Sequence, residues 1–216
     1  IPVISYDRLI TKAGVDLYVS FDAVRVGAEQ ARFLVERLKG KSRLVRIHGA
    51  KTDFNAHLMK RGQDEVLGPK IAKGDITVVH EDWAENWKPE AAKKILQAAI
   101  TRSGRFDAVL AANDGTAGGA AQALAEEGLA GKVLVTGQDA ELAACQRIVH
   151  GTQSMTIYKP LKRLADAAAE AAFALARRKP VVAKGDVDDG QGRVPSILID
   201  VIAVIDPRDN KVVPIY

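Results

Sequence analysis

The sequence is poor in cysteine and in aromatic residues: Cys145 is its one cysteine among 216 residues, and aromatic residues make up 5%. A single cysteine cannot form an intrachain disulfide, and on a predicted alanine-rich helix it should act as a small buried hydrophobe. No apolar run approaches the roughly 20 residues of a membrane-spanning helix. No signal peptide pattern opens the chain, which starts in a strand-like run at residues 1–6; this predicts a processed or truncated chain.

The sequence also has little excess charge. Its 31 basic and 27 acidic residues give a net charge of +4, and the densest basic cluster is residues 177–179. A nucleic-acid surface needs a basic stripe or a reading motif, so we expect no nucleic-acid partner. The four histidines are scattered without metal-ligand spacing, which predicts surface or hydrogen-bonded side chains and no metal. Residues 115–119 lack the spacing of a dinucleotide or phosphate loop, so no cofactor is expected, and close helix–sheet packing explains their glycines.

Aliphatic residues are abundant, and their order along the chain indicates the fold. Short apolar runs alternate with segments of helical periodicity, which is typical of βαβ units and a mostly parallel sheet. The sequence therefore predicts an α/β fold with a doubly wound sheet. We expect strands near residues 1–6, 43–48, 76–80, 107–112, 132–137 and 197–205, helices near 23–40, 55–67, 89–100, 116–127, 140–149 and 160–178, and a loop over 181–193.

Polar residues follow several of the predicted strands at the point where each strand ends. Examples are Asp7 and Arg8 after the first strand, Asn113 after residues 107–112, and Asp139 after residues 132–137. Trp83 follows the strand at 76–80. Because parallel strands open their carboxyl ends on one edge of a sheet, these side chains should meet along one crevice. The sequence therefore predicts a ligand-binding site at that edge.

Six motifs in a fixed order resemble the sugar-binding members of the type I periplasmic binding proteins, which serve bacterial ABC importers. The motifs span residues 6–8 (YDR), 20–22 (SFD), 112–120 (ANDGTAGGA), 137–140 (GQDA), 151–160 (GTQSMTIYKP) and 194–196 (VPS). The resemblance covers essentially the whole chain but lacks about a hundred amino-terminal residues that form most of the family's first lobe. It implies the periplasmic binding protein-like I fold, with one complete lobe plus fragments of the other.

The resemblance also implies a division into lobes. Residues 1–14 would be a strand and hinge segment of the first lobe, and residues 15–157 the second, sugar-binding lobe. The helix within residues 158–180 would belong to the first lobe, whereas residues 181–216 would form a return strand and a hinge segment. The unpaired first strand and the helix should then expose apolar faces, which favours a homodimer through these first-lobe fragments.

The implied ligand is a monosaccharide, with D-xylose as the expected sugar. A sugar ring presents hydroxyls that both donate and accept, around two faces of C–H groups, so it suits planar polar side chains and an aromatic plate. Trp83 is the candidate plate, and Asn55 could bind a hydroxyl or the ring oxygen. The predicted ligand-binding residues are Asp7, Arg8, Asn55, Trp83, Asn113, Asp139 and Lys159.

Several of these polar residues have a simpler interpretation. Asp139 and Asp114 could cap the helices that follow them, and for Asp114 capping is at least as strong an interpretation as ligand contact. Asp22 and Asp53 are interpreted mainly as caps. Trp87, four residues after Trp83, could share its helical face and serve packing alone. Lys159 could serve only to neutralise a nearby carboxylate.

The resemblance implies a substrate-binding component of a sugar importer, in which two lobes close over the ligand. Its partners would be the sugar and a membrane permease, and its location the periplasm or, with a lipid anchor, the cell exterior. No nucleophile–base pair is evident, so we expect no enzyme activity. The alternative function is a sugar-sensing effector domain of a repressor or of a two-component system.

Overall fold

The computed structural model describes residues 1–205, and its chain divides into two compact units. Unit 1 comprises Ile1–Asp22 and Lys159–Val201, and unit 2 comprises Ala23–Tyr158 together with the segment that begins at Ile202. The predicted carboxyl-terminal segment 181–216 is therefore shared between the units, and its residues 206–216 lie outside the described part. Residues 15–22, which we predicted to be in the second lobe, belong to unit 1 because their strand pairs with unit 1 strands.

Unit 2 is built on a four-stranded parallel sheet, as the alternation of strands and helices predicts. The strand order is β4-β3-β5-β6, so the chain crosses the sheet in both directions from its centre. β4 runs three residues further than expected and includes Trp83, which pairs in register with His48 of β3. The strands are β3 (Ser42–His48), β4 (Ile76–Trp83), β5 (Ala108–Ala111) and β6 (Leu134–Val135).

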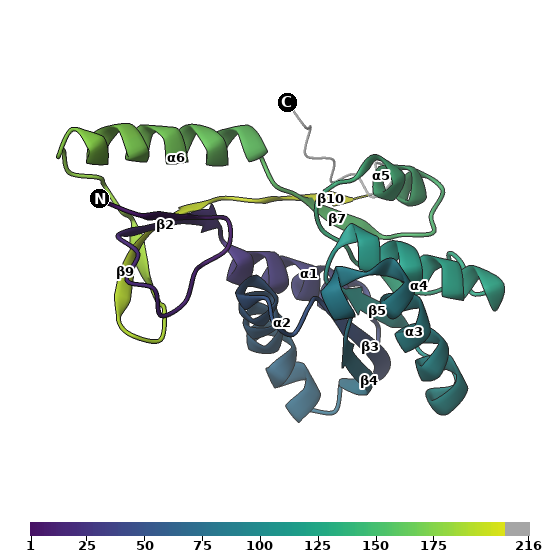
Figure 1. The fold of residues 1–216 in the computed structure, drawn as a ribbon. Helices are drawn as coiled ribbons and strands as arrows, with labels where there is room; N and C mark the ends of the chain where they lie inside the picture. Colours follow the sequence, from purple (N-terminus) through teal and green to yellow (C-terminus); the bar gives the residue numbers. More distant parts are fainter. Residues whose placement is uncertain (206–216) are drawn as a thin grey trace. The chain divides into compact units, whose positions relative to one another are not determined.

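Helices cover both faces of this sheet, α1 and α2 on one side and α3 and α4 on the other (Figure 1). Under α3 and α4 lies a core of small and aliphatic side chains that includes Val45, Val109, Leu96 and Leu124, each no more than 1% exposed. Burial of these apolar faces provides the main driving force for folding. The helical elements are α1 (Ala23–Arg37), α2 (Phe54–Ala72), the short 3-10 helix η1 (Glu85–Trp87), α3 (Pro89–Ser103), α4 (Asp114–Glu126) and α5 (Leu142–Val149).

Glycines allow the helices of each layer to approach closely. A β-carbon on Gly27 of α1 would lie 1.9 Å from the Met59 carbonyl oxygen of α2, and one on Gly62 would lie 1.9 Å from that of Val24. On the other face, a β-carbon on Gly119 would lie 2.0 Å from the carbonyl oxygen of Pro89 in α3. Gly119 therefore allows α4 to pack closely against α3. We expected the glycines of residues 115–119 to permit close helix–sheet packing, and at Gly119 the close contact is with a helix instead.

The aliphatic run at 197–205 is two strands rather than the single strand predicted. β9 (Arg193–Ile199) pairs with unit 1, whereas β10 (Ile202–Ile205) pairs antiparallel with β7 (Met155–Tyr158) in unit 2. Asp200, which is exposed, lies between them. Hydrophobicity alone did not distinguish one buried strand from two strands in different sheets.

Unit 1 has the strand order β1-β2-β9-β8, with β1, β2 and β9 parallel and β8 antiparallel to β9. β1 is thus paired rather than unpaired, and β8 lies within the segment that we expected to be a loop, because β9 provides it with a hydrogen-bonding edge. In α6 only Leu164 and Ala171 are buried, while Leu161 and Phe173 are exposed. The remaining bounds are β1 (Ile4–Tyr6), β2 (Leu17–Phe21), β8 (Gly185–Asp188) and α6 (Leu161–Ala176).

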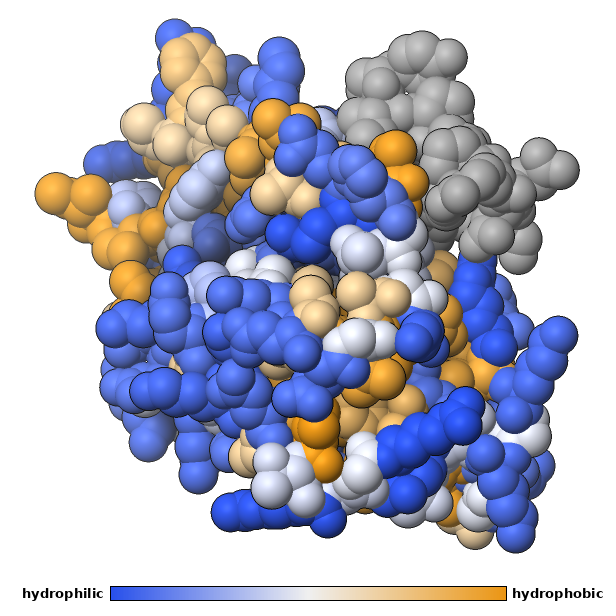
Figure 2. All heavy atoms as spheres, turned by 90° about the vertical axis from the view of Figure 1, so that its right-hand side faces the viewer, coloured by the Kyte–Doolittle hydropathy of each residue, from blue (hydrophilic) through white to orange (hydrophobic). Residues whose placement is uncertain are grey.

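The surface matches the balanced composition. The face drawn in Figure 2 is mainly hydrophilic, with apolar residues gathered in smaller patches between hydrophilic ones. Within residues 1–205, no helix is long and apolar enough to cross a membrane. Cys145 of α5 is half-buried rather than buried, and burial raises the pKa of its thiol.

Candidate functional site

Four of the predicted ligand-binding residues lie at the carboxyl edge of the unit 2 sheet. Trp83 ends β4, Asn113 follows β5 by two residues, and Asp139 follows β6. Asn55 lies in the first turn of α2, the helix that follows β3. The backbone amide of Asp114 donates to the carbonyl of Gln138 at 2.8 Å, which joins the loops that carry Asn113 and Asp139. The rule for parallel strands therefore places these four residues correctly on one edge.

Asn113 is the N-cap of α4. Its Oδ1 accepts from the Thr116 backbone amide at 2.9 Å, and the Thr116 hydroxyl in turn accepts from the Asn113 backbone amide at 3.1 Å. This capping box fixes the orientation of the side chain. Because the cap occupies Oδ1, the group that Asn113 can offer to a ligand is its Nδ2 amide, a hydrogen-bond donor.

Asp114 is not the cap that we considered; it is the first residue of α4 and only 1% exposed. Its carboxylate accepts from the Gln153 amide and the Thr156 hydroxyl, each at 2.8 Å, and from the backbone amide of Glu141 at 3.0 Å. Burial raises the pKa of Asp114 to about 6, and the charge of Asp139 adds to this effect. Asp114 therefore connects α4, β7 and the loop before α5 and is not oriented to bind a ligand.

Asp139 lies in a loop with a left-handed backbone, since its φ is 106° and that of Ala140 is 53°. Its backbone amide donates to the carbonyl of Ile157 at 2.8 Å, which anchors the loop to β7. The N-cap of α5 is Glu141, so the alternative that Asp139 caps this helix is wrong. Asp139 therefore lies at the strand edge without serving as the cap of α5.

Trp83 is accompanied by two histidines that the sequence did not single out for the site. The centre of its ring lies 4.7 Å from that of His48 and 4.8 Å from that of His57, with tilts of about 40°. His48 ends β3 and is 1% exposed, whereas His57 is an exposed residue of α2. Register could have identified His48, because it is the residue opposite Trp83 in the parallel pair.

Trp87 does not share a helical face with Trp83, because Trp83 ends a strand and Trp87 lies in η1 with a φ of 60°. Its Nε1 donates to the Asp53 carboxylate at 3.1 Å, and its ring lies against Gly49. Asp53 is the N-cap of α2 and accepts from the backbone amide of Asn55 at 3.0 Å, which confirms its predicted role. Trp87 thus supports the start of the helix that carries Asn55, which agrees with the structural role expected for it.

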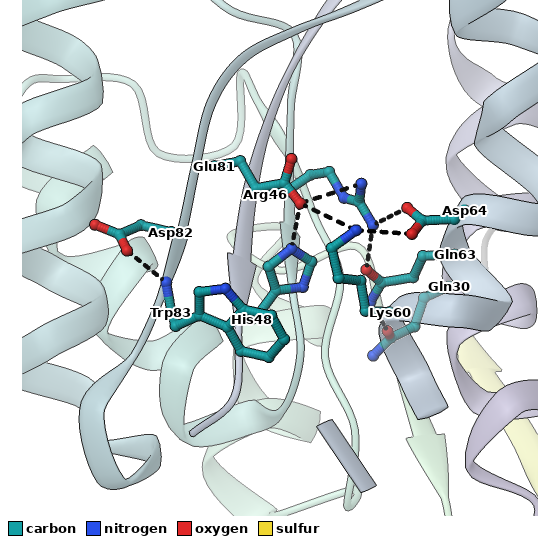
Figure 3. Close-up of polar contacts among 9 residues, drawn as sticks. All are labelled: Gln30, Arg46, His48, Lys60, Gln63, Asp64, Glu81, Asp82 and Trp83. Carbon is teal, nitrogen blue, oxygen red and sulfur yellow. Dashed lines mark hydrogen bonds and ion pairs between the residues drawn. The ribbon is translucent and has the colours of Figure 1, made fainter. Parts of the chain in front are cut away.

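A buried arginine lies next to this edge (Figure 3). The side chain of Arg46 in β3 is 3% exposed and forms ion pairs with Asp64 at 2.8 Å and with Glu81 at 3.3 Å. Lys60 lies 2.7 Å from Asp64 and 3.6 Å from Glu81. The surrounding cations and hydrogen bonds outweigh the effect of burial and hold the pKa of both carboxyls below their ordinary values. Among residues 1–205 no group of side chains could hold a metal ion.

The other three predicted ligand-binding residues lie in unit 1. Asp7 follows β1 with a φ of 61°, and its backbone carbonyl accepts from the hydroxyls of Tyr18 at 3.0 Å and Ser20 at 2.7 Å. Arg8 pairs with the Asp7 carboxylate at 3.7 Å. The Lys159 ammonium lies 5.5 Å from the ring centre of Phe21, the last residue of β2. Unit 1 therefore contains a carboxylate and a guanidinium just after β1 and, directly after β7, the Lys159 ammonium.

A family model described as "Periplasmic binding protein domain" matches residues 1–180. The chain belongs to the periplasmic binding protein family. This periplasmic binding protein is 46% identical to the D-xylose-binding periplasmic protein of Haemophilus influenzae over 214 residues, which cover 99% of this chain and 64% of that protein. It is 44% identical to the D-xylose-binding periplasmic protein of Escherichia coli, covering 94% of this chain and 62% of that one. The chain therefore spans a little under two thirds of the length of these relatives.

Solved structures agree with the fold of this periplasmic binding protein. A carbohydrate transporter solute binding protein from Chloroflexus aurantiacus, crystallised in complex with D-glucose, matches with a TM-score of 0.89 and 36% identity. The match covers 98% of this chain and 70% of that one. The periplasmic binding protein type I fold, with a mixed α/β arrangement and parallel sheets, is thus confirmed.

The pH dependence of stability should reveal the state of His48 in this periplasmic binding protein. Burial lowers the pKa of His48 to about 4, although its 2.7 Å hydrogen bond to Glu81 opposes the shift. A carboxylate only accepts hydrogen bonds, so Nε2 of the neutral ring donates to it. Since the unfolded chain binds this proton at a higher pH than the folded one, His48 favours folding above pH 6.5, and this contribution is lost as the pH falls toward 4.

We therefore expect His48→Gln, which keeps a donor for Glu81 but cannot titrate, to remove this part of the pH dependence. The difference in unfolding free energy between the two proteins should change between pH 6.5 and pH 4, by at most about 3 kcal/mol. Urea unfolding at several pH values measures it. Asp114, whose raised pKa favours folding at low pH, is present in both proteins and cancels in the difference. A constant difference across this range would show that His48 does not titrate as proposed.

Proposed function

We propose that the chain is the larger part of a monosaccharide receptor of an ABC importer and that its sugar is D-xylose. The observation that carries the proposal is the identity of 44–46% to two D-xylose-binding periplasmic proteins over nearly the whole chain. These relatives also support a periplasmic location and a binding function without catalysis. They favour this function over the alternative of a repressor or sensor domain.

The chemistry of unit 2 supports a sugar ligand. Asn113 offers an amide donor, Asp139 a carboxylate acceptor and Trp83 an apolar ring, all at one edge of one sheet. A carboxylate that accepts and an amide that donates can hold neighbouring hydroxyls of a pyranose, while the indole covers C–H groups. We propose the seven residues Asp7, Arg8, Asn55, Trp83, Asn113, Asp139 and Lys159 as sugar-binding residues.

The partners of such a receptor would be the sugar and the membrane permease of its importer. The closure of two lobes over the sugar and the assignment of the units to lobes stay predictions, as does attachment by a lipid anchor. A homodimer also stays a prediction, supported by the exposure of Leu161 and Phe173 on α6.

A titration with D-xylose, observed by NMR, tests the proposed function. The two tryptophans provide an internal comparison, because the Trp83 ring lies at the proposed site, whereas the Trp87 indole is already bound to Asp53. We expect D-xylose to shift the Trp83 indole signal and the Asn113 side-chain amide signals, with a much smaller effect on Trp87. D-glucose and D-allose serve as comparison sugars. The absence of any change at Trp83 and Asn113 would contradict the proposal.

A further inference from the structure

One buried glutamine contacts both loops that carry proposed sugar-binding residues of unit 2. Gln30 of α1 is fully buried, and its Nε2 donates to the carbonyl oxygens of Ala112 and Gly137, each at 3.0 Å. A third carbonyl oxygen, that of Ala111, lies 3.4 Å away. Ala112 immediately precedes Asn113, and Gly137 lies two residues before Asp139. The side-chain amide of Gln30 thus connects the chain just after β5 to the chain just after β6.

The orientation of this amide is fixed by its neighbours. Carbonyl oxygens only accept, so the nitrogen of Gln30 must face them. On its other side, Oε1 of Gln30 accepts from Nε2 of Gln63 at 3.1 Å, and Oε1 of Gln63 accepts from the Arg46 guanidinium at 3.1 Å. Because arginine only donates, each glutamine in this series has a single favourable orientation.

The series of contacts continues to the tryptophan (Figure 3). Arg46 pairs with Glu81, Glu81 accepts from His48 at 2.7 Å, and the His48 ring packs on Trp83. A connected polar network therefore extends from Trp83 to the loops of Asn113 and Asp139. Its central members, Gln30 and Gln63, are 0% exposed and lie beyond direct reach of a ligand in solution.

We propose that Gln30 is a positioning residue for sugar binding. Its amide holds the ends of β5 and β6 at a fixed separation, so that the Asn113 amide and the Asp139 carboxylate are preorganised for neighbouring hydroxyls. Preorganised groups bind a ligand without the cost of ordering them at the time of binding. The inference rests on the proposed function, but the rigidity of the two loops can be measured without sugar.

Gln30→Met tests the proposal, because methionine has a similar volume and lacks the donor. The carbonyl oxygens of Ala112 and Gly137 then lose their 3.0 Å contact with Gln30, which should loosen the two loops, whereas the carbonyl of Ala111 still accepts from the Thr136 hydroxyl at 3.0 Å. We expect the backbone amides of Asp114 and Asp139 to exchange their hydrogens about tenfold faster, while the amides of α3 keep their rates. We also expect the affinity for D-xylose to fall about five- to tenfold.

Leu34→Ala is the matched control. Leu34 lies on the same helix, is fully buried and has no part in the polar network. Its truncation should destabilise unit 2 throughout and leave the affinity of the folded protein unchanged. If Leu34→Ala lowers the affinity as much as Gln30→Met, or if Gln30→Met speeds exchange equally in α3 and in the two loops, Gln30 has only a structural role and the proposal is wrong.

Two further results separate the possible failures. If Gln30→Met does not fold, Gln63→Met tests the proposal instead, because this change leaves the contacts of Gln30 with the carbonyl oxygens in place but removes the partner that orients Gln30. We expect the loop amides of Gln63→Met to exchange about threefold faster. Unchanged exchange would overturn the proposal. If the unmodified chain does not bind D-xylose, the proposed function fails. Loop exchange then still shows whether Gln30 holds the two strand ends together.

Discussion

Replacing Asp139 by asparagine is expected to weaken D-xylose binding by about ten- to a hundredfold, since a hydrogen bond to a charged group contributes about 1.5–3 kcal/mol. Asparagine keeps the shape of the side chain and, like aspartate, tolerates the left-handed backbone found at φ 106°. Alanine would add backbone strain to the loss of the carboxylate and confuse the two effects. Calorimetric or NMR titration with D-xylose measures the change.

Asp75→Asn is the control for this experiment. Asp75 precedes β4 and so lies at the opposite, amino-terminal edge of the unit 2 sheet, where its carboxylate is 3.8 Å from Lys70. Its replacement removes the same charge from the chain without touching the proposed site, and the affinity should stay unchanged. Equal affinities for the Asp139 variant and the unmodified protein would remove Asp139 from the sugar site.

Replacing Arg46 by methionine is expected to lower the unfolding free energy of unit 2 by about 3 kcal/mol, because it removes one partner of a buried ion-pair network. The change leaves Oε1 of Gln63 without its donor and deprives Asp64 and Glu81 of a cation. The expected loss is at the lower end of the range for buried pairs, since the side chains of Asp64 and Glu81 are 46% and 35% exposed and water can hydrate them.

Urea unfolding followed by tryptophan fluorescence measures this loss selectively, because both tryptophans belong to unit 2. Arg61→Met on α2 is the control: its side chain is 63% exposed and lies 3.9 Å from Glu65, so its removal should change stability by less than about 1 kcal/mol. The Arg46 Nε has no hydrogen-bond partner among the described residues. If Arg46→Met is more stable than the unmodified protein, the free-energy cost of burying the guanidinium exceeds the stabilisation from its ion pairs.

The order of elements in unit 2 could be predicted from the sequence because it depends on local patterns. Alternating apolar runs and helical periodicity predicted β3, β4 and β5 and the helices between them, and the parallel-strand rule placed Trp83, Asn113 and Asp139 on one edge. Cap assignments were less certain, since Asn113 and Asp114 are adjacent and both residue types cap helices. Only the structure shows that Asn113 is the cap and that Asp114 is buried against Thr156.

Strand pairing between distant segments was not predictable in the same way. The run at 197–205 is aliphatic throughout, yet β9 pairs with β2 and β10 with β7. The segment at 181–193 lacks a strong strand pattern, yet part of it becomes β8 because β9 offers an edge. Strand pairing is made by backbone N–H and C=O groups, which every residue except proline carries, so the local side-chain pattern did not reveal which distant segments pair.

The sequence by itself determined the α/β class, the run of strands and helices in unit 2, and the polar residues at its strand ends, because each of these follows from side-chain periodicity within a few residues. Only the tertiary structure decided that Gln30 donates to the loops of Asn113 and Asp139, and that Arg46 and His48 connect the polar network of Gln30 to Trp83. A buried polar side chain is defined by the partners that the fold brings to it, and those partners lie up to 107 residues away in the chain.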